Sequence, residues 1–412
     1  MTPFDPAAAT AAYLAQIPQA QLSKAIAYTD GGHWLLLWGW LVSLSAYALI
    51  LKSRVLTRAA GRIQARKPRP RLACLAICLI FLALDFLLEL PWQTYASWWR
   101  ERQYGMTSQA WSGWMSDNLI VTVAQLPVFA VFFLALYAVI RRARRVWPVL
   151  AGALVSVLII GGVWAQPILF EPLVNAYTPA PAGPVRDMVT ALGKRTGVPT
   201  DKVFIYNGSK QSNRYTANVA GLFGTARIAL SDTMFAKGAD VAEIRGVVGH
   251  EMGHYVRNHL PLFGLFLGVM TMFAGLVVQG LYPIVRAWLG AADVGDVADP
   301  AGLPILMMIF ATLTLLGAPV INAAIRLEES DADTYSLEHA REPDGLARAF
   351  VQSVEYRAAA PSALEEALFY DHPSVARRIR KAMDWKAAHL AEAAGASPPA
   401  APAGSGPTPA GR

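Results

Sequence analysis

The stretch Val247-Val248-Gly249-His250-Glu251-Met252-Gly253-His254 contains the pattern His-Glu-x-x-His. On an α-helix, residues four apart lie on the same face, so His250 and His254 can bind a single metal ion. Imidazole nitrogen is a good ligand for Zn²⁺. Glu251 lies one position further round the helix and can act as a general base on the water that such an ion activates. The pattern is therefore typical of a zinc peptidase.

The residues before this pattern also favour a helix. Asp240 and Glu243 have the spacing of an N-cap residue and its capping-box partner. Apolar residues then follow at helical positions: Ala242, Val247, Val248 and Met252. Chance is a weak alternative, because the chain has only 7 histidines in 412 residues. A chance match is expected on the order of once in a hundred such chains or less.

The composition is that of a membrane protein. Hydrophobic residues make up 54% of the chain and charged residues 16%, against about 25% charged in an ordinary soluble protein. The 12 tryptophans gather near the ends of apolar runs, as in an interfacial aromatic belt. The net charge of +7 comes from basic residues between these runs, where they set membrane topology. We therefore expect a lipid bilayer, and no nucleic acid, as a partner.

Six apolar runs predict six membrane spans. They cover about 33–51, 72–91, 119–140, 147–165, 260–288 and 302–321. We expect a mostly α, polytopic membrane fold, with a short amphipathic lead-in over 1–32 and a four-span domain over 33–179. Residues 92–118 are expected to form a loop between spans. The lead-in lacks the basic region of a signal peptide.

The second span contains two pairs of unusual side chains. Asp85 and Glu89 are four apart and share a helix face. Either they face a protein interior or a water-filled cavity, or Glu89 simply lies at the membrane interface. Cys74 and Cys78 are the only cysteines. Inside an apolar run, they are expected to be packed and unpaired rather than a metal or redox site.

Residues 185–259 have the pattern of a soluble segment. A helix is predicted over 187–197, and short strands at 203–206, 217–221 and 228–230. These elements indicate a small sheet beside the helix of His250. We expect a small α+β, zincin-like metalloprotease domain over 180–390, which includes the last two spans. The Ala/Pro/Gly-rich tail over 391–412 is predicted to be disordered.

A catalytic zinc site needs a third protein ligand besides two histidines. His254 lies six residues before the fifth span, which is roughly 9 Å along a helix. The hairpin of two spans returns the chain to the same side. There the stretch Arg326-Leu327-Glu328-Glu329-Ser330-Asp331-Ala332-Asp333 follows the sixth span. Topology alone leaves the choice of carboxylate open, with Glu328, Glu329 and Asp331 as rivals.

With these residues the chain resembles the CAAX prenyl protease 1 family of integral-membrane zinc metallopeptidases, to which the bacterial heat-shock membrane protease is related. That family pairs His-Glu-x-x-His with a later Glu-x-x-x-Asp, matched here by residues 329–333. The resemblance implies a gluzincin-type enzyme with one Zn²⁺ per chain and Glu329 as the third ligand. It implies that Asp333 orients a ligating histidine. Arg326 matches a family arginine and is expected just behind the ligands. Glu328 and Asp331 are then interpreted as solvated charges.

Further matches concern the substrate cleft. One strand resembles the family's strand beside the cleft, where an extended substrate can pair through its backbone: Asn218, Val219 and Ala220. Asp371-His372-Pro373 resembles a late His-Pro motif, which implies that His372 stabilises the tetrahedral intermediate. His259 and His339 are interpreted as ordinary surface histidines outside the site. The chain departs from the family in having six spans, where eukaryotic members have seven, and in a less aromatic cleft strand.

The sequence therefore predicts a membrane-embedded zinc metalloendopeptidase that hydrolyses peptide bonds of prenylated or membrane-embedded substrates. One alternative is a quality-control protease that cuts misfolded membrane proteins. An alternative from another class is a non-proteolytic transporter or scaffold with a structural zinc. Such a site has no use for the base Glu251, and no inverted repeat of spans is visible.

The predicted location is a bacterial inner membrane. The basic short loops at 52–71 and 141–145 are expected in the cytoplasm, which places the catalytic domain outside. The family resemblance and the acidic loop at 293–299 favour a cytoplasmic catalytic domain instead. Because the charge rule gives short loops the most weight, it favours the extracytoplasmic side.

Overall fold

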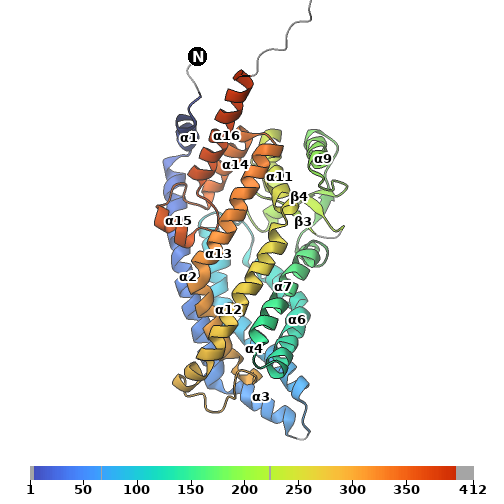
Figure 1. The fold of residues 1–412 in the computed structure, drawn as a ribbon, viewed down its shortest axis with the longest axis vertical. Helices are drawn as coiled ribbons and strands as arrows, with labels where there is room; N and C mark the ends of the chain where they lie inside the picture. The colour runs from blue at the N-terminus through green and yellow to red at the C-terminus, as the bar shows by residue number, and fades with distance from the viewer. Residues whose placement is uncertain (1–3, 66, 222–223, 396–412) are drawn as a thin grey trace, which may run out of the picture.

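The computed structural model describes residues 4–65, 67–221 and 224–395. Long helices run along the longest axis of the molecule, and the soluble elements gather at one end (Figure 1). Within these described ranges, six helical stretches are long and apolar enough to cross a membrane, which confirms the predicted number. Their helices are α2 (Gln19–Ser53), α4 (Pro70–Thr94), α6 (Trp111–Arg142), α7 (Trp147–Ala165), α12 (His259–Trp288) and α13 (Leu303–His339).

Several of these helices extend beyond the predicted spans. Helix α2 begins at Gln19, so the second half of the expected lead-in belongs to the first long helix, after the short helix α1 (Pro6–Leu14). The expected loop over 92–118 is also wrong. Helix α4 continues into a π-helical turn (Tyr95–Trp99) and α5 (Arg100–Gln103), which leaves 104–110 between helices. Hydropathy marks where the apolar composition ends, whereas helical hydrogen bonding continues into the polar flanks.

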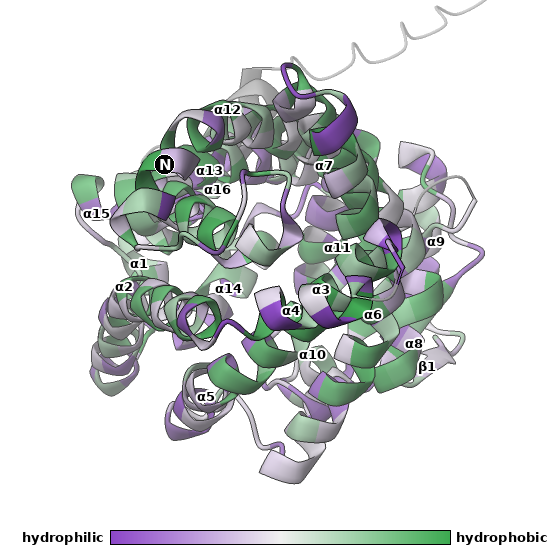
Figure 2. Cartoon of the chain, turned by 90° about the horizontal axis from the view of Figure 1, so that it is seen from below, coloured by the Kyte–Doolittle hydropathy of each residue, from purple (hydrophilic) through white to green (hydrophobic). Residues whose placement is uncertain are grey.

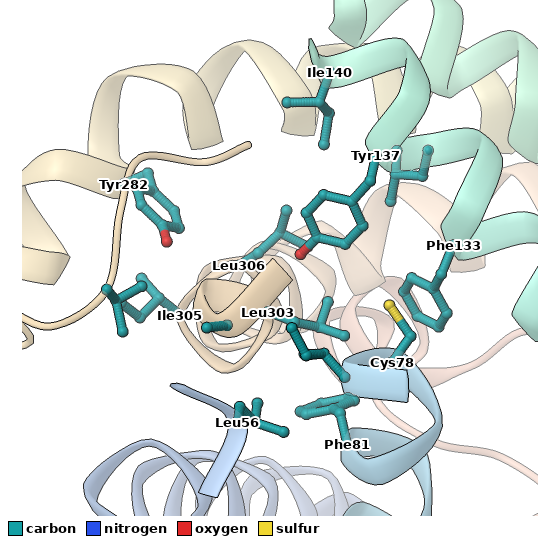
Figure 3. Close-up of a cluster of buried hydrophobic side chains, with 14 of the residues drawn as sticks. Leu56, Cys78, Phe81, Phe133, Tyr137, Ile140, Tyr282, Leu303, Ile305 and Leu306 are labelled. Carbon is teal, nitrogen blue, oxygen red and sulfur yellow. The ribbon is translucent and has the colours of Figure 1, made fainter. Parts of the chain in front are cut away.

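The membrane helices pack around a hydrophobic core at the end remote from the soluble elements (Figure 3). Helix α3 (Val55–Gln64) closes that end. The labelled core side chains are Leu56, Cys78, Phe81, Phe133, Tyr137, Ile140, Tyr282, Leu303, Ile305 and Leu306. Cys74 and Cys78 are both buried and free, as expected from their apolar surroundings.

Large apolar side chains are exposed on the outer faces of these helices. Examples are Val131 at 67%, Val157 at 69% and Leu316 at 71%. Hydrophobic residues, drawn in green, make up much of the long helices in the view from below (Figure 2). A soluble monomer rarely exposes so much contiguous apolar surface, but a bilayer covers it. The surface therefore agrees with an integral membrane protein.

Asp85 and Glu89 line a cavity of about 740 Å³ between α4 and α6. Ser43 of α2 donates a hydrogen bond to Glu89. The remaining polar residues of the cavity wall include Gln93, Asn118, Thr122 and Gln125. Of the two alternatives, the structure therefore favours carboxylates that face a cavity.

The soluble elements include a four-stranded sheet in the order β1–β2–β4–β3. The predicted strands are confirmed as β2 (Val203–Tyr206), β3 (Ala217–Ala220) and β4 (Arg227–Ser231), and the predicted helix as α9 (Pro184–Thr196). Strand β1 (Tyr177–Pro179) was not expected, because three residues ending in proline give a weak strand pattern. Strands β2 and β4 are parallel, and the other pairs are antiparallel. Strand β3 lies at the edge of the sheet.

Helices complete the soluble domain on both sides of the His-Glu-x-x-His motif. Helix α11 (Val241–Val256) starts with the capping box predicted for Asp240 and Glu243. After α13 come α14 (Pro343–Gln352), α15 (Ala363–Phe369) and α16 (Val375–Gly395). Because α16 reaches Gly395, the predicted disorder is wrong for 391–395, and the rest of the predicted tail, 396–412, lies outside the described residues.

Candidate active site

Helices α11 and α13 approach each other closely through small residues. A Cβ atom added to Gly249 would lie 2.8 Å from the Cβ of Ala340, and one added to Gly253 would lie 3.0 Å from the Cβ of Tyr335. Ser336 Oγ donates a hydrogen bond of 2.7 Å to the carbonyl oxygen of Gly246. Any larger residue at these glycines would push the helices apart. The close packing therefore brings the acidic stretch of α13 opposite the histidines of α11.

Three donor groups from these helices converge on one point: His250, His254 and Glu329. The Nε2 atoms of the two histidines are 3.1 Å apart. His250 Nε2 lies 3.3 Å from Glu329 Oε2, and His254 Nε2 lies 3.3 Å from Glu329 Oε1. Ligands with bonds of about 2.0–2.1 Å to a tetrahedral ion lie roughly 3.3 Å apart. Glu329 Oε2 is buried and accepts no hydrogen bond within the described chain, so the donors fit a zinc ion.

The charges at this point also favour a cation. Burial would raise the pKa of Glu329, but His250, with help from His254 and His372, holds it well below its usual value. Burial would lower the pKa of His250, but Glu329 and Asp333 outweigh that effect and raise it to about 10. The carboxylate is therefore ionised and attracts a positive charge to the imidazole. A metal ion would take the place of that proton.

Glu251 faces a cavity of about 230 Å³ that also exposes His250, Glu329 and His372. Burial raises the pKa of the Glu251 carboxyl above its usual value, although His250 and His254 oppose this shift. A carboxylate with a raised pKa is a better proton acceptor at neutral pH than an ordinary one. The cavity thus combines a candidate base with the candidate ligands.

Asp333 is placed as the family resemblance implied, and it has a partner that the sequence did not indicate. Its Oδ1 lies 2.9 Å from His250 Nδ1. Arg378 of α16 donates to both carboxylate oxygens of Asp333, at 2.8 and 2.6 Å. Burial would raise the pKa of Asp333, but Arg378 and His250 hold it at about 2. Arg378 is one of four basic residues in 377–381, and their sequence pattern does not show which one turns inward.

His372 reaches the same cavity. Its Nε2 lies 3.2 Å from Glu329 Oε1, and its Nδ1 lies 2.8 Å from Asp371 Oδ1. Arg357, which sequence reasoning also missed, lies 3.4 Å from His372 Nε2 and lines the cavity. Asp371 can therefore fix the orientation of the His372 ring while Nε2 faces the site.

Arg326 does not lie beside the ligands as expected. It donates hydrogen bonds to the backbone carbonyls of Glu366, Ala367 and Tyr370. These residues form the end of α15 and lead directly to Asp371 and His372. Arg326 thus fastens the segment that carries His372 to the helix that carries Glu329.

The predicted substrate strand lies next to the cavity. Tyr215, Thr216 and Ala217 contribute to the cavity wall. The predicted contacts Asn218, Val219 and Ala220 follow along β3, and Asn218 Oδ1 is buried and accepts no hydrogen bond from any residue described. Because β3 has a neighbour on one side, its other edge is open to backbone pairing. The substrate contact itself stays a prediction.

Not all of the four residues interpreted as lying outside the site are remote from the ligands. His259 is 6% exposed, its Nδ1 lies 3.0 Å from His254 Nδ1, and its Nε2 lies 3.1 Å from Asp331 Oδ2. The interpretation of His259 as an ordinary histidine is therefore wrong, whereas Asp331, whose side chain is 43% exposed, is a surface charge as expected and in addition contacts His259. Burial raises the pKa of the half-buried Glu328 to about 7. His339 stacks on Tyr335 and lies away from the ligands, as expected.

A second group of possible metal ligands lies between α2 and α15. It consists of Asp30, His33 and Glu365, of which Asp30 is exposed and the other two are half-buried. This group does not line the cavity of Glu251. Exposed acidic groups commonly converge without a metal. The candidate catalytic centre is therefore the buried group on α11 and α13.

Two family models match the chain. Residues 179–386 match peptidase family M48. Residues 7–176 match the CAAX prenyl protease N-terminal family, described as five membrane helices. Among the residues described, four candidate spans fall within that second range, in line with the smaller number of spans expected from the sequence.

Similar proteins are found in bacteria and eukaryotes. The uncharacterized metalloprotease YhfN of Bacillus subtilis (strain 168) is 27% identical over 369 residues, which is 88% of this chain and 85% of the relative. The CAAX prenyl protease 1 homolog of Arabidopsis thaliana is 26% identical over 302 residues, 71% of this chain and 69% of the relative. The crystal structure of S. mikatae Ste24p superimposes with a TM-score of 0.73 at 20% identity, over 89% of this chain and 90% of that chain. This last likeness shows a shared fold.

Proposed function

The chain belongs to peptidase family M48 and is a membrane metalloprotease, and from that premise we propose that it is a zinc-dependent endopeptidase. The ligands are His250, His254 and Glu329. One observation carries the proposal: three donor groups converge at 3.1–3.3 Å from one another. They do so at a cavity that also exposes a carboxylate with a raised pKa, Glu251.

The reaction is hydrolysis of a peptide bond. When bound, zinc supplies a Lewis acid for the scissile carbonyl and for the attacking water. Glu251 accepts a proton from that water and passes it to the nitrogen of the leaving amine as the C–N bond breaks. In its imidazolium form, with its Nδ1–H on Asp371, His372 donates from Nε2 to the negative charge that develops on the carbonyl oxygen. Asp333 holds Nδ1 of His250, so that Nε2 points into the site.

The proposed substrates are peptide chains that lie at the membrane, either prenylated or membrane-embedded. Helix α12 enters the bilayer directly after the motif, because it begins at His259. Helix α13 carries Glu329 on the same continuous helix as a candidate span. The open edge of β3 can hold an extended peptide through its backbone. A chain anchored in the bilayer therefore reaches the cavity without leaving the membrane surface.

The proposal is tested with purified protein in detergent. Zinc content is measured by elemental analysis, and one ion per chain is expected. Cleavage is followed with a farnesylated peptide, with the same peptide lacking the farnesyl group, and with an unfolded membrane protein. Removal of metal by a chelator is expected to abolish cleavage, and added Zn²⁺ is expected to restore it. Cleavage that persists after complete metal removal would contradict the proposal, and the preferred substrate distinguishes prenyl-directed from quality-control proteolysis.

Substitution of His372 by Ala is expected to lower kcat by about 10²–10³-fold, because a donor to the developing oxyanion is lost. The zinc content and KM are expected to change little. His389→Ala is a matched control, since His389 stacks on Trp385 in α16, away from the site. Equal kcat values in the His372→Ala and His389→Ala variants would remove His372 from the mechanism.

The proposed location is a bacterial inner membrane with the catalytic domain outside. The basic segment of α3 and the Arg141–Arg145 turn lie at the end remote from that domain, where the positive-inside rule predicts cytoplasm. The acidic loop lies there too, because Asp293 pairs with Arg54 and Asp296 with Arg144. Digestion of the catalytic domain by a protease added to intact spheroplasts tests this orientation.

A further inference from the structure

We infer that His259 is a positioning residue for the metal ligand His254: it accepts the Nδ1–H of His254 and so directs the Nε2 lone pair of that histidine into the metal site. This inference rests on the proposed function, because it takes His254 as a ligand. It assigns a role to a histidine and an aspartate that lie outside the ligand set and outside the Asp333–Arg378 pair.

The two imidazole rings lie so that each nitrogen of His254 faces a different partner. His254 Nε2 lies 3.1 Å from His250 Nε2, so this nitrogen faces the other ligands. His254 Nδ1 faces the opposite way and lies 3.0 Å from His259 Nδ1. The rings meet edge to face, with centroids 5.0 Å apart and an interplanar angle of 78°. Two ring nitrogens at this distance are compatible with a hydrogen bond, in which one donates and the other accepts.

Asp331 sets the direction of that hydrogen bond. A neutral imidazole carries one N–H and one lone pair. His259 Nε2 lies 3.1 Å from Asp331 Oδ2, and an ionised carboxylate only accepts. His259 therefore donates from Nε2 to Asp331 and keeps the lone pair on Nδ1. That lone pair accepts the Nδ1–H of His254, which leaves the lone pair of His254 on Nε2, where the metal binds.

The local chain geometry brings His259 back to His254. Asn258 adopts φ 55°, in the left-handed region, between α11 and α12. This single residue lets the chain turn so that His259, the first residue of α12, packs back against His254 in the last turn of α11. His259 is 6% exposed, whereas its partner Asp331 has a side chain that is 43% exposed and is also approached by Arg257 at 3.4 Å. The buried ring thus links the ligand to a carboxylate at the surface.

The two ligand histidines are consequently held in different ways. His250 is held by a direct contact between its Nδ1 and the carboxylate of Asp333. His254 is held by the imidazole of His259, which is in turn held by the carboxylate of Asp331. Partners of this kind fix the ring orientation and the tautomer of a ligand, and their loss weakens metal binding by about 10–100-fold. If His259 merely filled space, an apolar residue of similar volume would replace it without loss.

The test compares zinc affinity in His259→Leu, His259→Asn and His259→Gln variants of the full-length protein, by competition with a chelator. In Asn, the amide oxygen is bonded to Cγ, as Nδ1 is in histidine, so an acceptor remains at nearly the same place. In Gln, the amide lies one bond further out. We expect Leu and Gln to raise the zinc dissociation constant by about 10–100-fold and Asn to keep it within about threefold of the wild type.

The absorption spectrum of the Co²⁺-loaded protein is expected to divide the variants in the same way. The spectrum of His259→Asn is expected to resemble that of the wild type, and the spectrum of His259→Leu is expected to be shifted. His339→Leu is the matched control, because His339 stacks on Tyr335 outside the site. If His259→Leu does not fold, the zinc dissociation constants of His259→Asn and His259→Gln are sufficient to test the inference. The inference would be overturned if His259→Asn and His259→Gln both bound zinc as tightly as the wild type. It would also be overturned if His259→Asn bound zinc more weakly than His259→Leu.

The proposed function is tested separately within this experiment. Wild type is expected to bind zinc, and His254→Ala is expected to lose it. If the wild type does not bind zinc, the proposed function fails. If wild type binds zinc and His254→Ala does not, while His259→Leu binds as tightly as wild type, the inference about His259 fails alone.

Discussion

Replacement of Glu251 by Gln is expected to lower kcat by about 10²–10⁴-fold while the protein still binds one zinc ion per chain. Gln has nearly the same shape but accepts no proton from water. Glu251 is not one of the three converging donors, so the metal site stays intact. The two measurements, zinc content and kcat on the preferred peptide, therefore separate the base from the ligands.

Glu338→Gln is the matched control for this substitution. Glu338 is exposed on α13 and lies outside the cavity, so the same loss of a carboxylate is expected to leave kcat and zinc content unchanged. Full activity of Glu251→Gln would rule out the proposed mechanism. Loss of zinc in this variant would instead make Glu251 part of the metal site.

Replacement of Arg378 by Leu is expected to lower the free energy of unfolding by about 3–5 kcal/mol, because it leaves the buried carboxylate of Asp333 without its cation. Arg378 is 8% exposed and Asp333 1% exposed. The guanidinium also lies 4.1 Å above the ring of Phe350. The effect is measured by unfolding in detergent, and the zinc dissociation constant is measured alongside it.

Two further variants show whether the loss of stability in Arg378→Leu comes from the buried pair. Arg380→Leu is the control, since Arg380 forms an exposed pair with Asp384 and such pairs contribute about 0–1 kcal/mol. A double variant with Leu at both 333 and 378 is expected to recover much of the stability, because apolar residues replace buried ion pairs at little cost. Its zinc affinity is expected to stay low, because His250 lacks an acceptor. An Arg378→Leu variant as stable as the Arg380→Leu variant would contradict the buried pair.

The third ligand illustrates how far the sequence alone reaches. Topology predicts that an acidic cluster returns near the histidines but leaves the ligand open, and the family resemblance selects Glu329. The packing of α13 gives a physical reason for the same choice. Its buried residues at 329, 332, 333 and 336 follow helical spacing along one face. Glu328 lies off that face and Asp331 points to the surface, so neither joins the ligands.

Other parts of the site depend on tertiary contacts that no local pattern contains. The inward turn of Arg378, and not of its basic neighbours, depends on how α16 packs against Phe350 and Asp333. The role of His259 depends on one left-handed residue between two helices. The extent of α2 could not be predicted either, because an apolar window measures composition and not helical hydrogen bonding. The six spans were predictable from local apolar composition, and the capped α11 and three strands from local residue spacing.

The continuity of α13 determines whether the catalytic part of the molecule can be separated from its membrane part. This helix contains 37 residues, which is roughly 55 Å, and it joins a bilayer segment to Glu329 without a break. The hairpin of α12 and α13 lies between the two halves of the ligand set. No cut in this region frees a water-soluble catalytic fragment that retains all three ligands. Truncation therefore cannot yield a soluble enzyme, and purification has to keep the α12–α13 hairpin in a lipid or detergent environment.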